Sequence, residues 1–472
     1  MRSLPIVSDP KTRQAEFQIG YIWIALAMAV FAGFAIGAYL AFVIGFGFPL
    51  GEGFYSFVQT HGHVQLVGWA GLFMIGISFH VIPRLASVPI AHPQWIPRVL
   101  WLMACGLLLR SVGHSVLPYV GESFFQAPVS WVVAGSGLLE WCGIVVYVAL
   151  LIKTVRGVGG ASGQPALLSV RPYFGMMLAG WILYASLNLI LLLHMAMQMD
   201  IVVSRAWNEF AVEVFIGLVL LPVAFAFSVR MLPLYLTLRA PDWPVRAIAY
   251  AYLLSLCLQV IPASPFLSEL TPEIAGSISS LGMLLKGGVV VWFVWQLDLL
   301  TRRHDPWTVK REVQPLPERR PTRPGLPDYG EFGRFERLVY AAYTWLVLAA
   351  FFEILLGATA LFGYPPPISG DAIRHMYLLG FITHLIFGVS VRVIPGLLMK
   401  KRLASAPLVD ATLWLGSTAV VCRVLPLMIP SGLFETIPAS VGVAQTAFAF
   451  SGMIGLGAVV CLATNLWKTA VR

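Results

Sequence analysis

Long apolar runs separated by short polar loops cover most of the chain. Runs of about 20 or more mostly apolar residues lie at 20–45, 60–83, 97–119, 128–153, 173–198, 210–236, 245–264, 275–299, 338–363, 373–397, 405–429 and 441–467. A run of about 20 such residues crosses the hydrocarbon of a bilayer as a helix. Since a chain in lipid must satisfy its own backbone groups, runs of this length are expected to be helical. The pattern predicts an all-α polytopic membrane protein with twelve transmembrane helices.

The composition supports this class. Hydrophobic residues make up 58% of the 472 residues and charged residues 11%, whereas soluble domains carry about 25% charged residues. The net charge of +9 does not indicate nucleic-acid binding, because the basic residues lie at the ends of apolar runs. Five scattered cysteines without a CxxC or CxxCH motif give no indication of a zinc site or a covalently attached haem.

The charge of the loops alternates along the chain. Basic loops, such as the one with Arg84, alternate with acidic loops, such as the one with Glu52. Basic loops face the cytoplasm, so both termini are expected to be cytoplasmic. We predict a single membrane domain over 1–472, with a cytoplasmic linker rich in proline and arginine at 301–335.

The second and tenth predicted helices share one pattern. HVQLVGWAGLFMIGISFHVIP begins at His63 and HMYLLGFITHLIFGVSVRVIP begins at His375, 312 residues later. The same offset pairs Gly68 with Gly380, Gly76 with Gly388, Ser78 with Ser390 and Pro83 with Pro395. A weaker third copy carries SVRMLP and has Glu213 in place of the histidine. The chain is therefore predicted to form three pseudo-symmetric four-helix units, at about 15–160, 170–300 and 336–470.

Shared glycines and serines let helices approach closely, but the shared histidines need another explanation. The predicted topology places His63 and His375 near the outer surface, with Arg110 and Arg423 just beneath them. Ionisable residues in membrane spans are costly and indicate function by default. Two neutral imidazoles on facing helices can supply both axial ligands of a haem iron. Arginine is the natural partner of the haem propionates, because its planar guanidinium binds carboxylates in a bidentate way.

Other ionisable residues lie within the predicted spans, among them Lys286, Glu140 and Glu353. Ion pairs that orient the helices are the favoured role, either with one another or with Arg110 and Arg423. Proton relay is the alternative.

Copper is a competing interpretation for the remaining histidines. His61 projects about 200° away from His63 on an ideal helix, so it faces a different site. Together with His114 or His194 it could hold a copper ion, since imidazole suits that metal. Glu213, near the outer end of the sixth helix, is a further candidate metal ligand.

The two histidine-bearing helices resemble a known family. The patterns His63–x4–Gly68 and His375–x4–Gly380 resemble subunit I of the haem-copper oxidases and nitric oxide reductases, which has twelve spans in three arcs. As a whole the chain is more similar to the NnrS family, twelve-span haem proteins linked to nitric oxide stress. This likeness rests on the LWL…R helices, FSVRMLP and RHMYLLGFITHLIFGVSVRVIPG.

The resemblance implies specific site residues. Subunit I of the oxidases holds its low-spin haem by one histidine from span two and one from span ten, which implies a haem b on His63 and His375. Arg110 and Arg423 are then expected at its propionates. The oxidases have a second histidine on span ten where this chain has Ile373, and span seven lacks their copper ligands. A conventional haem–copper dioxygen centre is therefore not expected.

Several functions are consistent with these features. The leading interpretation is an NnrS-type haem protein of the bacterial inner membrane, involved in nitric oxide response or detoxification, with its bis-histidine haem near the outer face. Its expected partners are membrane lipid, nitric oxide or another small diatomic ligand, and a quinol or cytochrome electron donor, but no nucleic acid. The first alternative is a divergent nitric oxide reductase or quinol oxidase with a second metal, and the second is a twelve-helix transporter without haem. Oxidoreductase activity on nitric oxide or a quinol thus stays open.

Overall fold

Long helices make up the described part of the chain. The computed structural model describes residues 17–121, 123–156, 165–267, 271–305, 330–428 and 439–472, and within these ranges it contains helices and no β-strand. Eleven of the helical segments described are long and apolar enough to cross a membrane. The prediction of a polytopic all-α membrane protein is therefore confirmed. Most of the predicted linker, 306–329, lies outside the described residues.

Seven of the eleven spans are continuous helices, and the other four change conformation along their length. The continuous helices are α5 (Ile96–Val120), α6 (Gln126–Arg156), α7 (Pro165–Gln198), α11 (Pro272–Leu297), α12 (Phe335–Leu361), α15 (Ala406–Met428) and α17 (Ala439–Val471). In the other four a π-helical segment joins two α-helices: α1 (Gly20–Met28), Ala29–Gly33 and α2 (Phe34–Gly45); α3 (Phe54–His63), Val64–Gly71 and α4 (Leu72–Ala86); α8 (Arg205–Val214), Phe215–Leu220 and α9 (Leu221–Leu236); α13 (Gly370–His375), Met376–Thr383 and α14 (His384–Leu397). Short 3₁₀ turns occupy Pro93–Trp95 and Pro265–Leu267.

The predicted span at 245–264 forms a shorter helix. α10 (Val245–Val260) has 16 residues, or about 24 Å at 1.5 Å per residue, whereas the hydrocarbon core is about 30 Å thick. Pro244 precedes its first residue and Pro262 follows shortly after its last. Proline does not continue a helix and keeps the residue before it out of the helical conformation. Twelve full-length spans are predicted, and the described residues contain eleven together with this shorter helix.

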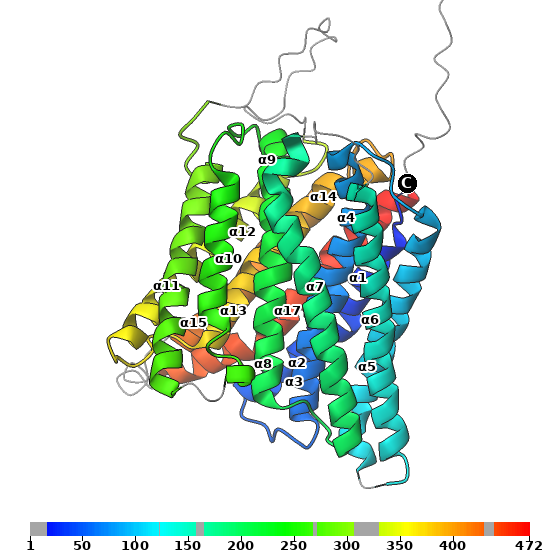
Figure 1. The fold of residues 1–472 in the computed structure, drawn as a ribbon, viewed down its shortest axis with the longest axis vertical. Coiled ribbons are helices and arrows are strands. Elements are labelled where there is room, and N and C mark those ends of the chain that lie inside the picture. The colour runs from blue at the N-terminus through cyan, green and yellow to red at the C-terminus, as the bar shows by residue number, and fades with distance from the viewer. Residues whose placement is uncertain (1–16, 122, 157–164, 268–270, 306–329, 429–438) are drawn as a thin grey trace, which may run out of the picture.

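Three spans lie inside the bundle and the others surround them. The share of buried residues in the apolar stretch of each span shows this. It is 94% in Phe54–Ala86, 83% in Gly370–Leu397 and 67% in Arg205–Leu236, compared with at most 44% in the other spans. The outer helices pack on one another in sequence, α5 on α6, α6 on α7, α10 on α11, α11 on α12, α15 on α17 and α17 on α2. Figure 1 shows α4, α9 and α14 toward one end of the bundle and α3 and α8 toward the other. The inner spans are the three that carry the repeated motif.

The π-helical segments of the inner spans occupy matching sequence positions. Met376–Thr383 lies 312 residues after Val64–Gly71, the offset of the sequence repeat, and both directly follow a motif histidine. The segment Phe215–Leu220 begins two residues after Glu213, the residue that replaces the histidine in the weaker copy. π-Helical turns are rare and often occur at functional sites. His63 and His375 are thus the last α-helical residues before the π-helical segments of their spans.

The prolines of the repeated motif lie near the other end of the inner spans. Pro83, Pro233 and Pro395 each lie two or three residues before the last residue of α4, α9 and α14. Proline removes a backbone donor and clashes with the preceding turn, so a helix seldom continues far beyond it. The shared VIP or MLP sequence therefore accounts for the similar ends of these three helices.

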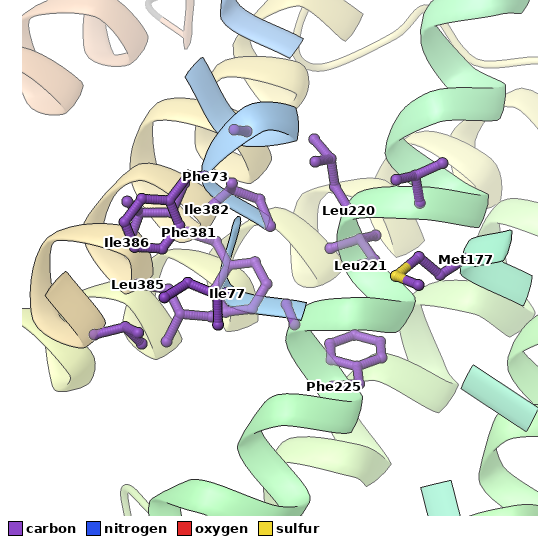
Figure 2. Close-up of a cluster of buried hydrophobic side chains, with 14 of the residues drawn as sticks. Phe73, Ile77, Met177, Leu220, Leu221, Phe225, Phe381, Ile382, Leu385 and Ile386 are labelled. Carbon is purple, nitrogen blue, oxygen red and sulfur yellow. The ribbon is translucent and has the colours of Figure 1, made fainter. Parts of the chain in front are cut away.

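Apolar side chains fill the space where the three inner spans meet (Figure 2). Phe73 and Ile77 come from α4, Phe225 from α9, and Phe381 and Ile386 from the span that ends in α14. An apolar cavity of about 70 Å³ is lined by residues from these same spans. The motif histidines lie outside this apolar cluster, near the first residues of their spans.

Shared glycines let the outer helices approach the inner ones. A Cβ atom at Gly76 would lie 2.6 Å from the Cβ of Tyr21, and one at Gly388 would lie 2.8 Å from a methyl carbon of Val339. Tyr21 belongs to α1 and Val339 to α12, which are the first helices of two predicted units. The role of these glycines in helix packing, expected from small-residue interfaces, is therefore confirmed.

A buried ion pair joins α11 and α12. Lys286 Nζ lies 2.7 Å from Glu353 Oε1, and both side chains are at most 5% exposed. Gln259 donates a hydrogen bond of 3.0 Å to the same carboxylate, and the Tyr377 hydroxyl donates one of 2.7 Å. The predicted ion pairing between helices is confirmed here, with lysine rather than arginine as the partner of Glu353.

Breaking this pair on one side should destabilise the fold strongly. We expect Glu353→Ala to lower the free energy of unfolding by about 3–5 kcal/mol, because it leaves the Lys286 ammonium buried without a counterion. The double variant Lys286→Met/Glu353→Leu should lose much less, since no buried charge is left unpaired. Reversible unfolding in mixed micelles, followed by circular dichroism, measures both. Equal losses in the single and double variants would contradict this account.

Candidate functional site

His61 and His63 lie two residues apart on α3 and face opposite sides of it. His61 donates a hydrogen bond from Nδ1 to the Gly33 carbonyl oxygen at 2.7 Å. On the other side, His63 Nδ1 lies 3.0 Å from the Tyr184 hydroxyl, and His63 Nε2 lies 2.9 Å from Glu140 Oε2. The expected angle of about 200° between the two side chains agrees with these contacts.

His61 and His375 line one cavity of about 220 Å³, which we call the histidine cavity. It lies where α3 and α13 approach α2, and its polar wall includes Asp371, Arg374 and Arg423. Trp69, Leu378 and Ile382 are among the apolar residues that line it. His63 does not line this cavity. The structure thus places His61, and not His63, in the same cavity as His375, and the pairing of His63 with His375 stays a prediction.

The two histidines of this cavity have the same hydrogen-bonding arrangement. His375 donates from Nδ1 to the Asp371 carbonyl oxygen at 2.8 Å, just as His61 donates to Gly33. Because a carbonyl oxygen only accepts, the proton of each neutral ring is on Nδ1 and the lone pair is on Nε2. Within the described residues neither Nε2 has a hydrogen-bond partner. Metal-binding histidines are typically held in this way, with the nitrogen that does not bind the metal donating to a carbonyl or carboxylate.

Two arginines add positive charge to the histidine cavity. Arg423 Nη2 lies 3.6 Å from Asp371 Oδ2, and its guanidinium stacks over the Phe448 ring at 4.2 Å. Arg374 Nη2 lies 3.4 Å from Glu213 Oε1. The Nε atoms of both arginines are buried without a hydrogen-bond partner in the described part of the chain. Each guanidinium therefore has donor capacity left for an anionic group.

Arg110 and His63 line a second, smaller cavity of about 30 Å³, which we call the arginine chamber. Tyr184, Asn188 and Asn208 also line it. Arg110 is therefore not in the histidine cavity, although the sequence pairs it with Arg423. Glu140, the expected alternative partner of an arginine, instead has both carboxylate oxygens within 3.1 Å of His63 Nε2.

The other predicted metal ligands do not come together. His114 is fully buried, and its ring contacts Thr60 and the Ile201 carbonyl oxygen. His194 is exposed on the outer face of α7, and Glu213 is paired with Arg374. No group of three or more His, Cys, Asp or Glu side chains in the described ranges is arranged to hold a metal ion. The copper site built from His61, His114 and His194 stays a prediction, and this geometry does not assemble it.

Sequence reasoning missed several residues of the two cavities. Asp371 precedes His375 by four residues, a spacing that brings side chains together on one helix face, and this signal was available. Arg374 directly precedes His375 in the sequence, so its place beside the site could also have been predicted. Tyr184, Asn188 and Asn208 carry no motif that marks them, because they come from helices that only the fold brings into contact.

Comparison of the chain with protein-family models and with curated proteins found no match. What the site can do therefore has to be argued from its own residues. Two imidazole lone pairs and two partly unsatisfied guanidinium groups line the histidine cavity, which suits a ligand that combines a metal with carboxylates.

The two carboxylates that contact histidines should differ in their effect on stability. Glu140 is 2% exposed and Asp371 is 46% exposed. Glu140→Ala should cost about 1–3 kcal/mol of unfolding free energy, because a buried imidazole nitrogen loses its partner. Asp371→Ala should cost about 0.2–1 kcal/mol, as for exposed ion pairs. Unfolding in mixed micelles compares the two, and a larger loss for Asp371→Ala would contradict the assignment of burial.

Proposed function

We propose that the chain is a haem-binding integral membrane protein of NnrS type that takes part in nitric oxide response or detoxification. The proposed cofactor is a haem b held in the histidine cavity. One observation carries the proposal: His61 and His375 line the same cavity, and each has Nδ1 tied to a backbone carbonyl and Nε2 without a partner.

The donor set of the cavity fits such a cofactor. Neutral imidazoles are standard axial ligands of haem iron, and the Nδ1 hydrogen bonds hold His61 and His375 in the required tautomer. Arg374 and Arg423 are the candidate partners of the propionates, since arginine binds carboxylates in a bidentate way. His63 suits the ligand role less well than His61, because both of its ring nitrogens already have partners.

The protein's own residues would bind and orient the group. When bound, a haem iron between two imidazoles supplies one-electron transfer. The carbonyls of Gly33 and Asp371 would fix the rings, and apolar residues such as Trp69 and Ile382 would limit the access of water. Nitric oxide or another small diatomic ligand, and a quinol or cytochrome donor, are the partners that this function implies. A reductase with a second metal is less well supported, because no three-ligand cluster lies in the described ranges.

The same proposal includes the architecture and location. Three four-helix units are supported by the matching π-helical segments and by the burial of the three motif-bearing spans. In this arrangement α10 serves as the seventh helix. The alternating loop charges support a bacterial inner-membrane location with both termini cytoplasmic.

Absorption spectra of variants test the ligands. Purified wild-type protein should show the sharp reduced bands of a bis-histidine haem. His61→Ala and His375→Ala should each abolish them, because each removes one axial ligand. His63→Ala is the matched control on the same helix and should keep them.

Two outcomes would contradict the proposal in different ways. Loss of the signal in His63→Ala together with its retention in His61→Ala would restore the pairing predicted from the repeat. Absence of haem from the wild-type protein after expression with ample haem supply would reject the cofactor and leave the transporter as the remaining function.

A glycine beside His61 offers a test of ring placement. A Cβ atom at Gly37 would lie 2.5 Å from His61 Cε1, so Gly37→Ala must displace the ring. We expect the haem affinity to fall by about 10–100-fold, the range seen when the support of a metal ligand is disturbed. Gly175→Ala in α7 is the control, because nothing lies within 4 Å of its Cβ position. Haem titration of the apoprotein measures both, and equal affinities would refute the predicted placement.

A further inference from the structure

The arginine chamber contains a buried guanidinium without a direct ion-pair partner among the described residues. Arg110 is 3% exposed, and its Nε and Nη1 atoms have no hydrogen-bond partner among the described residues. Within those residues no carboxylate lies within 4 Å of its guanidinium. A buried charge without a partner costs several kcal/mol, so the fold is expected to supply a partner from outside the chain.

The other polar groups of the chamber are bonded to one another or to the backbone, and not to the Arg110 guanidinium. Glu140 directs both of its carboxylate oxygens to His63. His63 and Tyr184 are hydrogen-bonded to each other. Gln59, which also lines the chamber, is bonded on both sides of its amide to the backbone of Val203. The acidic and amide groups closest to Arg110 are therefore already engaged.

Two side-chain amides complete a set of free donors. Asn188 of α7 and Asn208 of α8 line the chamber, and neither side chain makes a hydrogen bond to another described residue. The free volume of about 30 Å³ exceeds the 10–15 Å³ of such volume that one water needs. It is thus large enough for an ion of one to three heavy atoms. Guanidinium and amide N–H groups facing such a space are typical of anion binding.

The histidine cavity provides an internal comparison. Arg423 is the counterpart of Arg110 in the sequence repeat, and it has Asp371 as an acidic neighbour at 3.6 Å. Arg110 has no carboxylate within ion-pair distance among the described residues, because Glu140, which attracts it over a longer distance, directs its oxygens to His63. The two cavities share Gly62, Leu66, Asn208 and Val212 in their walls.

We propose that the arginine chamber is a binding site for a small monovalent inorganic anion, held by Arg110 with Asn188 and Asn208. The site occupies a different cavity from that of the two histidines, although Asn208 lines both, and it does not depend on haem. An anion there would neutralise Arg110 and would lie directly behind the wall of the histidine cavity.

Bromide is a suitable probe, because it is small and its anomalous scattering locates it. The full-length protein in detergent is titrated with sodium bromide, at an ionic strength held constant with sodium gluconate, and the melting temperature is recorded. The melting temperature should rise with bromide in the wild-type protein, since a ligand that binds only the folded state stabilises it. Arg110→Gln should raise the apparent dissociation constant at least tenfold.

Two further variants keep the result interpretable. Arg230→Gln is the matched control, because Arg230 also has a buried Nε without a partner but lines a different, apolar cavity. It should keep the wild-type response. If Arg110→Gln does not fold, Asn188→Leu, which fills the chamber and leaves the charge, should also abolish the bromide response.

The outcomes separate this inference from the proposed function. Anomalous density for bromide beside Arg110 is expected, whereas a chamber holding only water, or an unchanged response in Arg110→Gln, would overturn the inference. The same titration on His61→Ala protein that lacks haem should still show bromide binding. Bromide binding by a wild-type protein that takes up no haem would count against the haem proposal alone.

Discussion

The angle between His61 and His63 determines how the polar interior is divided. Two residues on one helix point about 200° apart, so one imidazole enters the histidine cavity and the other enters the arginine chamber. Gly62 lies between them and belongs to the wall of both cavities. A Cβ atom there would have nothing within 4 Å, so the space beside Gly62 is open. Both sites therefore depend on the registry of a single turn of α3.

The polar groups inside this bundle follow one constraint. A charge removed from water needs a partner, because the cost of leaving it alone is several kcal/mol. Lys286 is paired with Glu353, and Arg423 has Asp371 as a more distant partner. Of these three basic residues, only Arg110 has no carboxylate within 4 Å in the described part of the chain. In both the histidine cavity and the arginine chamber, arginine donors are left without a hydrogen-bond partner among the described residues.

The sequence was sufficient for the membrane class and for the position of most spans, whereas the haem ligands that it implies stay a prediction. Apolar runs predicted the helices because hydrocarbon thickness fixes their length, and the repeat identified the three inner spans. Hydropathy alone does not predict that α10 is short, although its flanking prolines, Pro244 and Pro262, mark the shorter helix in the sequence. The sequence could not predict Tyr184 or Asn208 beside the cavities, because contacts between distant helices leave no periodic signal in either helix.

The placement of His63 and His375 in different cavities has a geometric cause. Each motif histidine lines a cavity together with the arginine of its own predicted unit: His63 with Arg110, and His375 with Arg423. Residues of α7 complete the first cavity and residues of α2 complete the second. The two motif histidines therefore lie in two different cavities. His61 breaks this equivalence, since the counterpart of His61 on span ten is Ile373, and only the histidine cavity gains a second imidazole. That difference, rather than the repeat itself, is what makes one of the two cavities suited to a metal.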